Sequence, residues 1–250
     1  MIATVAALAG AALVSTSTTF AGGADAPRDT VVTADNLSRL VIGGGAERLK
    51  REIDLTDGSG SDVLDARNYF GYAGIDLLHW LTLMGGGGQV EAKSGAGNDY
   101  GDADTSWMAG AAVGLLAHPI RTPEYLAGTL RIDAQYAHWS YEADMAMDTV
   151  EWTEDRAALI ASMEFPVEHA FADSDSIPFS TVLSVGPVYS VIDGEMPGAR
   201  PGSRVDFEET DSMGLLCGLD IKFASNWSAG WQGRWLGEDV SHTFSAAFHF

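Results

Sequence analysis

Two residues with the chemistry needed for acyl transfer, His138 and Ser140, lie two positions apart in the chain. A histidine imidazole accepts a proton near neutral pH, so a histidine beside a serine could act as general base and make the hydroxyl a nucleophile. Side chains two positions apart share one face of a β-strand. The spacing therefore marks a candidate hydrolytic pair, and the alternative interpretation is a polar pair within a belt of aromatic residues.

Three carboxylates, Asp99, Asp102 and Asp104, lie close together in a glycine-containing segment. Carboxylate oxygens at such spacing could bind Ca²⁺. The segment lacks the full twelve-residue calcium-loop pattern with its terminal glutamate, so a solvated acidic loop is favoured. We expect no resident metal and no cofactor.

Charges of both signs lie at alternate positions in the middle of predicted strands. On the inner face of a narrow barrel such charges would pair across strands, because an unpaired charge is costly in a poorly hydrated interior. The paired side chains would fill the barrel, so the lumen would not form a wide path for solute. The residues predicted to form this charge network in the lumen are Glu47, Asp76, Arg131, Asp133, Arg156, Glu164, Asp220, Lys222 and Arg234.

The elements that must position these residues are β-strands, because apolar residues recur with a period of two. In one segment Arg131 and Asp133 alternate with leucine, isoleucine and alanine, and the segment 213–223 repeats the pattern. A helix would scatter both sets around its circumference. The single cysteine, Cys217, falls on an apolar face, where a thiol ionises poorly and is a weak nucleophile.

Reading turns between these segments predicts one antiparallel barrel of about ten strands, with eight or twelve as alternatives. The linkers alternate between short turns and mostly longer, acidic, glycine-rich loops, as in a transmembrane barrel. An even strand count puts both ends of the chain on one side. The predicted strands span 39–53, 67–78, 81–93, 105–117, 124–141, 150–165, 178–192, 208–223, 228–237 and 242–250.

Composition and charge exclude several classes of function. The formal net charge of −21 argues against a nucleic-acid partner, which needs a basic surface. Mean hydropathy is +0.03 and no run of 18 apolar residues occurs, so a bundle of membrane-spanning helices is not expected.

The N-terminus reads as a signal peptide over residues 1–21, with a short apolar run followed by Thr19-Phe20-Ala21. No lysine or arginine precedes the apolar run, which points to a translation start farther upstream. Residues 22–38 would form a short N-terminal segment, and residues 39–250 the barrel.

The last segment, 243–250, alternates apolar residues and ends in phenylalanine, and it resembles the C-terminal strand of bacterial outer-membrane β-barrel proteins. The tracts 69–74 and 80–88 are similar to small barrels of this group. The resemblance implies location in the outer membrane of a Gram-negative cell, contact with lipid and glycolipid, and insertion by the barrel-assembly machinery. Nothing in the sequence selects an oligomeric state. Phe244, Phe248 and Phe250 would belong to the assembly signal.

Aromatic residues near predicted strand ends favour lipid around the barrel, because amphipathic rings gather at the two headgroup levels. The preferred function is a structural barrel or small porin-like channel without enzymatic activity. A soluble exported barrel that binds a small apolar ligand is one alternative. The predicted belt comprises Trp80, Trp107, Trp139, Tyr141, Phe165, Phe223, Trp227 and Trp235.

A second alternative is an outer-membrane hydrolase, acting on lipid or protein. His138 and Ser140 resemble the pair of outer-membrane phospholipases, in which a histidine and a serine two positions apart face the lipid. That family also uses a polar orienting residue, usually asparagine, on the adjacent strand. No asparagine occurs in residues 150–165.

Overall fold

The computed structural model describes residues 40–58, 60–78, 80–94, 99–121, 127–145, 148–166, 178–198, 203–210, 212–223 and 226–250. The predicted signal peptide and the segment 22–38 lie outside these residues. Within the described ranges the regular structure is entirely β-strand, and no helix is long and apolar enough to cross a membrane.

Eleven strands follow one another in chain order, each antiparallel to its partners. They are β1 (Leu40–Leu55), β2 (Gly60–Leu78), β3 (Leu81–Ser94), β4 (Asp104–Arg121), β5 (Ala127–Met145), β6 (Asp148–Pro166), β7 (Pro178–Pro197), β8 (Arg204–Glu209), β9 (Met213–Phe223), β10 (Trp227–Leu236) and β11 (Asp239–His249).

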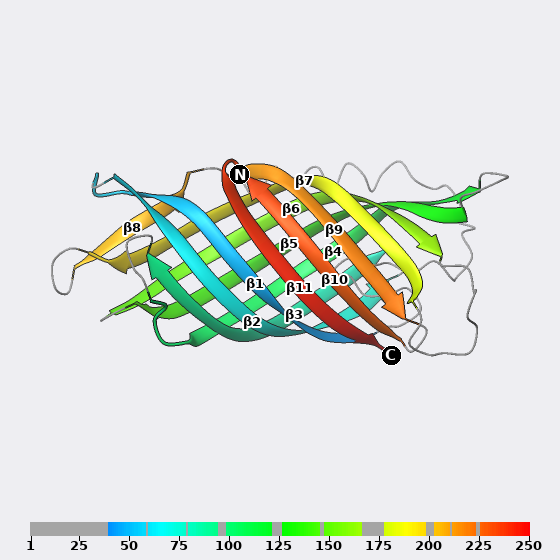
Figure 1. Ribbon diagram of the computed structural model, residues 1–250, viewed down its shortest axis with the longest axis horizontal. Helices are drawn as coiled ribbons and strands as arrows, with labels where there is room; N and C mark the ends of the chain where they lie inside the picture. Colours follow the sequence, from blue (N-terminus) through cyan, green and yellow to red (C-terminus); the bar gives the residue numbers. More distant parts are fainter. Residues whose placement is uncertain are drawn as a thin grey trace.

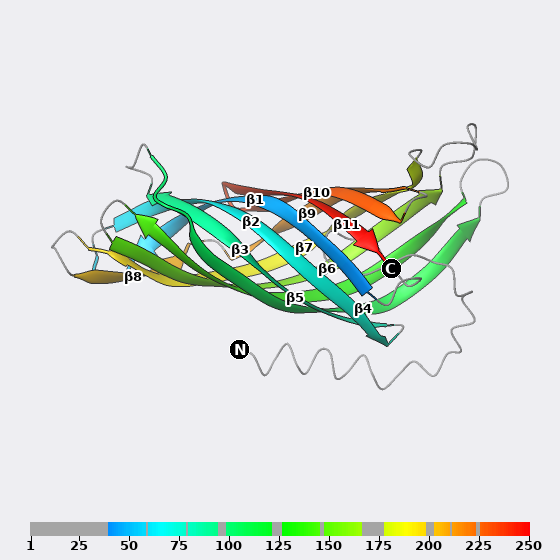
Figure 2. The same ribbon diagram turned by 90° about the horizontal axis from the view of Figure 1, so that it is seen from below.

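The sheet closes on itself because β1 pairs with β11, from Val41 opposite His249 to Arg48 opposite His242. Ten strands, all except β8, form this wall, so the prediction of an all-β, ten-stranded antiparallel barrel is confirmed. Figure 1 shows the tilted strands side by side along the barrel, with the C-terminus at one end and β8 at the other. The turned view in Figure 2 shows the wall curving around an interior.

The predicted strand 208–223 is wrong in one respect, because it is two strands, β8 and β9. The β10–β11 hairpin ends early, with Leu236 paired to Asp239 around Gly237 at a φ of 57°. β1 and β7 continue past it, and β8 pairs with both of them. We call the end of the barrel where β8 lies the β8 end. There the wall consists of the eight strands β1 to β8.

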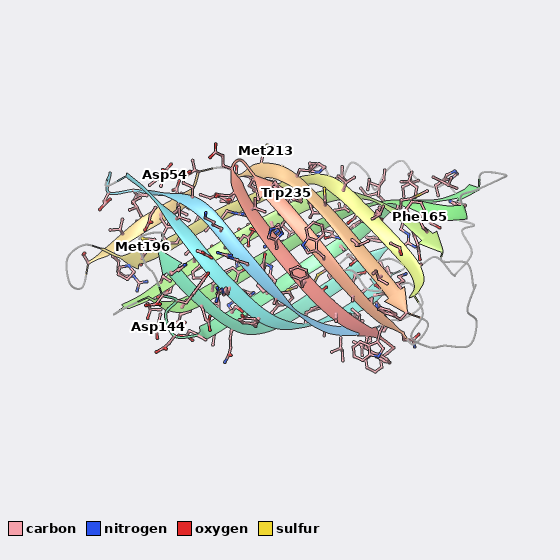
Figure 3. The ribbon with its side chains drawn as sticks, viewed as in Figure 1. Asp54, Asp144, Phe165, Met196, Met213 and Trp235 are labelled. Carbon is pink, nitrogen blue, oxygen red and sulfur yellow. The ribbon has the colours of Figure 1, made fainter. Side chains whose placement is uncertain are left out.

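Several predicted loops are shorter than expected, because the strands continue into them. The predicted loops 54–66 and 142–149 reduce to the links 56–59 and 146–147. Backbone pairing persists there while the outward side chains change from apolar to charged, as at Asp54 and Asp144. Both residues lie toward the β8 end in Figure 3, and Phe165 lies toward the opposite end.

The two faces of the wall differ in chemistry. Inward positions hold most of the buried polar and charged side chains, and outward positions carry a band of exposed apolar ones. Inward glycines make room for aromatic rings: a Cβ at Gly45 would lie 2.8 Å from a ring carbon of Phe70. Outward apolar residues that are more than a third exposed include Ile42, Ile75, Leu83, Leu116, Leu159, Leu183, Leu219 and Phe244.

Candidate functional sites in the lumen and on the outer face

Four charged side chains meet in the middle of the lumen and form what we call the mid-lumen charge cluster: Glu47 on β1, Glu154 and Arg156 on β6, and Arg234 on β10. Glu154 accepts hydrogen bonds from Arg156 Nη2 at 2.6 Å, Arg234 Nη1 at 3.1 Å and Ser190 Oγ at 2.9 Å. Glu47 pairs with Arg156 at 3.3 Å and also with Arg234. Two carboxylates thus share two guanidinium groups, so the cluster is neutral and crosses the lumen.

A second ion pair lies beside this cluster, toward the β8 end. Arg51 Nε on β1 is 2.9 Å from Glu209 Oε1 on β8, and Arg51 Nη1 donates to Ser241 Oγ at 2.7 Å. The Arg51 and Glu209 side chains are 0% and 1% exposed. This pair fixes the short strand β8 to the continuous wall.

A third group of charges lies on the side of the C-terminus. Glu164 lies 3.5 Å from Arg131 Nη2 and 3.4 Å from Lys222 Nζ, and it accepts a hydrogen bond from Ser180 Oγ at 2.8 Å. These contacts join β5, β6, β7 and β9. They place a paired carboxylate in the second half of the lumen.

The structure thus brings the predicted lumen residues into two groups. Glu47, Arg156 and Arg234 belong to the mid-lumen charge cluster, and Arg131, Glu164 and Lys222 belong to the group around Glu164. The others are more dispersed: Asp76 accepts from Thr82 Oγ1 at 2.5 Å, and Asp133 and Asp220 are buried on β5 and β9.

Three charged side chains of the described lumen were missed from the sequence: Glu154, Arg51 and Glu209. Glu154 lies two positions before Arg156, and Arg51 four positions after Glu47, so strand alternation could have assigned both to the lumen. Glu209 depends on β8 being a separate strand, which the alternation pattern did not indicate.

Aromatic side chains fill the lumen between the mid-lumen charge cluster and the β8 end. Trp139 stacks on Tyr141 with ring centroids 5.6 Å apart, and Tyr141 stacks on Trp152 at 4.8 Å. Phe70 meets Trp139 edge to face at 5.3 Å. This set packs with Phe207 and other buried apolar residues, including Ile53, Leu64, Val90, Ile192 and Met196.

The assignment of Trp139 and Tyr141 to an outer aromatic belt is therefore wrong. Both share the inward face of β5 with Arg131 and Asp133, and both are only 4% exposed. Trp107 and Trp227, by contrast, face outward and are about half exposed, at 51% and 50%. Trp139 and Tyr141 were assigned to the belt because they lie near the end of a predicted strand. Strand alternation, by contrast, places both side chains on the inward face.

One cavity of about 40 Å³ remains beside the mid-lumen charge cluster. Glu47, Arg156, Gln135, Phe70 and Trp139 are among its lining residues. A cavity of this size has room for a few water molecules, although most of its lining is apolar. Trp139, part of the aromatic stack, belongs to the lining of this cavity.

His138 and Ser140 lie on the outward face of β5, as strand alternation predicts. His138 Nδ1 is 2.9 Å from Asp155 Oδ1 on β6, and Tyr136 Oη donates to the same oxygen at 2.5 Å. The Trp107 ring lies 5.2 Å from the His138 ring. An acid therefore occupies the orienting position for which the sequence offered no asparagine. Asp155 occupies an outward position of β6 by strand alternation, so the sequence pattern could have identified it.

The remaining candidates are dispersed. Asp99 and Asp102 are exposed, and Asp104 Oδ1 accepts from the backbone of Thr105. Within the described ranges, no three His, Cys, Asp or Glu side chains are arranged to hold a metal ion. Cys217 lies half-buried on the outward face of β9.

The C-terminal aromatic residues project outward where the barrel closes. Phe250 N donates to Leu40 O at 3.0 Å, which joins the chain end to the start of β1. Phe248 packs edge to face against Trp227 at 5.2 Å and Phe250 at 4.9 Å. Phe244 is 59% exposed.

Comparisons with known proteins assign no family to the chain. No protein-family model and no curated protein matches the chain. The outer membrane protease OmpT from Escherichia coli aligns at 10% identity and a TM-score of 0.38, over 84% of this chain and 95% of OmpT. The transport unit of the autotransporter AIDA-I from Escherichia coli aligns at 9% and 0.38, over 85% and 90% of the two chains. The translocator domain of NalP from Neisseria meningitidis aligns at 10% and 0.33, over 85% and 89%. Similarities at this level carry no argument about function.

Proposed function

We propose that this protein is an integral outer-membrane β-barrel with a closed lumen, and that its role is structural rather than conducting. The observation that carries the proposal is the contrast between the two faces of the wall. The outward face carries the exposed apolar band, and the inward face carries paired charges and stacked aromatic rings. A soluble barrel has the opposite polarity, with apolar residues inside and polar residues outside.

The apolar band also has a defined edge toward the β8 end. On β1 the outward side chains change from Ile42 to exposed Arg48 and Lys50, and on β5 they change from Ile132 to exposed Glu142 and Asp144. A tilted strand of about 9–11 residues crosses a bilayer. The longer strands, which reach 20 residues in β7, would project beyond the bilayer at the β8 end. We assign the β8 end to the cell exterior and the C-terminal end to the periplasm.

Membrane fractionation combined with gel mobility tests this proposal. A closed barrel satisfies its backbone hydrogen bonds internally, so we expect the chain to stay folded in detergent until it is boiled. Heated and unheated samples of the outer-membrane fraction should then migrate differently. Identical mobility, together with release from membranes by salt alone, would contradict the proposal and favour the soluble ligand-binding barrel.

The contact between His138 and Asp155 favours a second candidate function, an outer-membrane ester hydrolase that acts on lipid. Asp155 bound at Nδ1 would orient the ring and leave Nε2 for the Ser140 hydroxyl. Ser140 Oγ would attack an ester carbonyl while His138 takes its proton. His138 would then protonate the departing alcohol as the ester C–O bond breaks. Water, deprotonated by the same histidine, would release the acyl group and restore Ser140.

Hydrolysis of acylated lipids by the detergent-folded protein tests this second candidate. Ser140→Ala and His138→Ala should each abolish lipid hydrolysis while leaving the heat-modifiable mobility unchanged. Ser228→Ala is a matched control, because Ser228 Oγ also contacts a histidine, His249 Nε2 at 2.9 Å, on different strands. Absence of hydrolysis by the wild type, or full activity of Ser140→Ala, would exclude this role.

A further inference from the structure

Outward-facing cations gather on one sector of the β8 end. The chain has only 14 lysine and arginine residues against 35 aspartate and glutamate residues. Among those whose side chains the structure describes, five point into the lumen. Four of the outward ones lie together on three adjacent strands and form what we call the outer cationic patch: Arg48 and Lys50 on β1, Arg67 on β2, and Lys93 on β3.

The strand register forces two of these cations together. Arg48 and Arg67 are direct cross-strand neighbours, an arrangement that is destabilising for like charges. Asp65 offsets part of this repulsion, because it accepts from Arg48 at 3.2 and 2.9 Å and lies 3.9 Å from Lys93 Nζ. The Arg48 side chain nevertheless remains 55% exposed.

Tyr100 holds the rest of the patch in place. Its ring lies under the Arg67 guanidinium, 3.9 Å from carbon to centroid, and 4.8 Å from Lys93 Nζ. Its hydroxyl donates to Asp65 at 2.8 Å. Burial and this hydrogen bond raise the pKa of Tyr100, so the phenol stays neutral and adds no negative charge. The Arg67 guanidinium is thus presented on an aromatic platform with its edges toward solvent.

The patch concentrates cations in a strongly acidic protein, whose formal net charge is −21. Its four cations face two nearby acids, Asp65 and Glu91, the latter opposite Arg67 on β3. Asp99 and Asp102, which flank Tyr100 in the chain, are two further acids, so the sector is distinguished by its concentration of cations and not by a net positive charge. Glu52 lies farther along β1, away from the apolar band. An anion that reached this sector would meet several exposed cations on adjacent strands.

The position of the patch identifies the kind of anion. Arg67 lies two residues before the outward Tyr69 on β2, on its β8-end side, and Tyr69 is 53% exposed at the edge of the apolar band. In the proposed orientation this is the headgroup level of the outer leaflet. Arginine binds phosphate oxygens in a bidentate manner, and two arginines offer two such forks. We propose that the outer cationic patch binds a phosphate group of an anionic glycolipid in the outer leaflet, an inference that rests on the proposed membrane location.

Binding of a defined glycolipid to the detergent-folded full chain tests this inference. The probe is a diphosphorylated, acylated diglucosamine lipid in mixed micelles, compared with the same lipid after enzymatic removal of its phosphates. We expect the phosphorylated lipid to bind more tightly. Arg67→Gln should weaken its binding roughly tenfold, equivalent to about 1.4 kcal/mol. Arg67 is the preferred site because its change leaves the contacts of Asp65 with Arg48 and Tyr100 intact.

Arg204→Gln is the matched control, because Arg204 also lies on the exterior at the β8 end but outside the patch, where it pairs with Glu151 and Glu195. The affinity of Arg204→Gln for the phosphorylated lipid should equal that of the wild type. Equal binding of the two lipids, or wild-type affinity in Arg67→Gln, would contradict phosphate binding by the outer cationic patch. If the protein still showed heat-modifiable mobility, the proposed membrane barrel would stand. A wild-type chain without heat-modifiable mobility would overturn the membrane location and this inference with it.

Discussion

Glu154 is the residue on which the mid-lumen charge cluster depends. Its carboxylate is 0% exposed, and it contacts Arg156 and Arg234 together with Ser190. Two guanidinium groups buried beside it would lose half of their negative partners if it were removed. The cluster joins β1, β6 and β10, so its loss would weaken contacts between strands across the lumen.

Glu154→Ala should therefore lower the free energy of unfolding by about 3–5 kcal/mol, the usual cost of leaving a buried charge without its partner. Urea unfolding of the protein in lipid vesicles, followed by tryptophan fluorescence, measures the change. Arg204→Gln, at a partly exposed ion pair, should cost only about 0–1 kcal/mol. Equal, small effects of both variants would show that the cluster does not stabilise the barrel.

Arg131→Ala should be milder than Glu154→Ala, because Glu164 keeps its contacts with Lys222 and Ser180. We expect a loss of about 1–3 kcal/mol for the hydrogen bond to a charged group. The same unfolding experiment ranks the two variants. A larger loss in Arg131→Ala would contradict the partition of the lumen charges described above.

At the scale of the strands, the sequence predicts pairing order well and strand ends poorly. Alternation located ten segments because each has one apolar and one polar face. It could not show that β8 separates from β9, because that break depends on the early end of the β10–β11 hairpin and on the space left between β1 and β7. Applying alternation consistently through β5 would have placed Trp139 on the inward face. Applying it through β6 would have placed Asp155, the partner of His138, on the outward face.

The C-terminal strand provides the test at this scale. Removing Phe250 deletes the hydrogen bond to Leu40 and the ring contact with Phe248. We expect secretion to persist while the amount of folded protein in the outer membrane falls. Leu215→Ala, which removes an exposed outward side chain from β9, is the control and should insert normally. Normal insertion of a chain lacking both Phe248 and Phe250 would remove the basis for an assembly signal here.

At the scale of the whole molecule, the charge of −21 resides mainly on strand ends and loops, because the bases in the lumen offset most of its acids. The mid-lumen charge cluster and the aromatic stack occupy successive levels of the barrel, and a cavity of about 40 Å³ lies beside them. The sequence predicted paired charges in the lumen. It did not predict how the inward rings stack on one another, because long-range packing among β2, β5 and β6 is not encoded in the pattern of any one strand.

Conductance of the purified protein in planar lipid bilayers tests the closed lumen most directly. With paired charges and stacked rings across the barrel, we predict conductance that is small or absent, with little preference between cations and anions. Glu154→Ala, which loosens the mid-lumen charge cluster, should raise conductance above the wild-type level. A large, steady and strongly cation-selective pore formed by the wild type would contradict the account, because it would require an open path through a lumen that the described side chains fill.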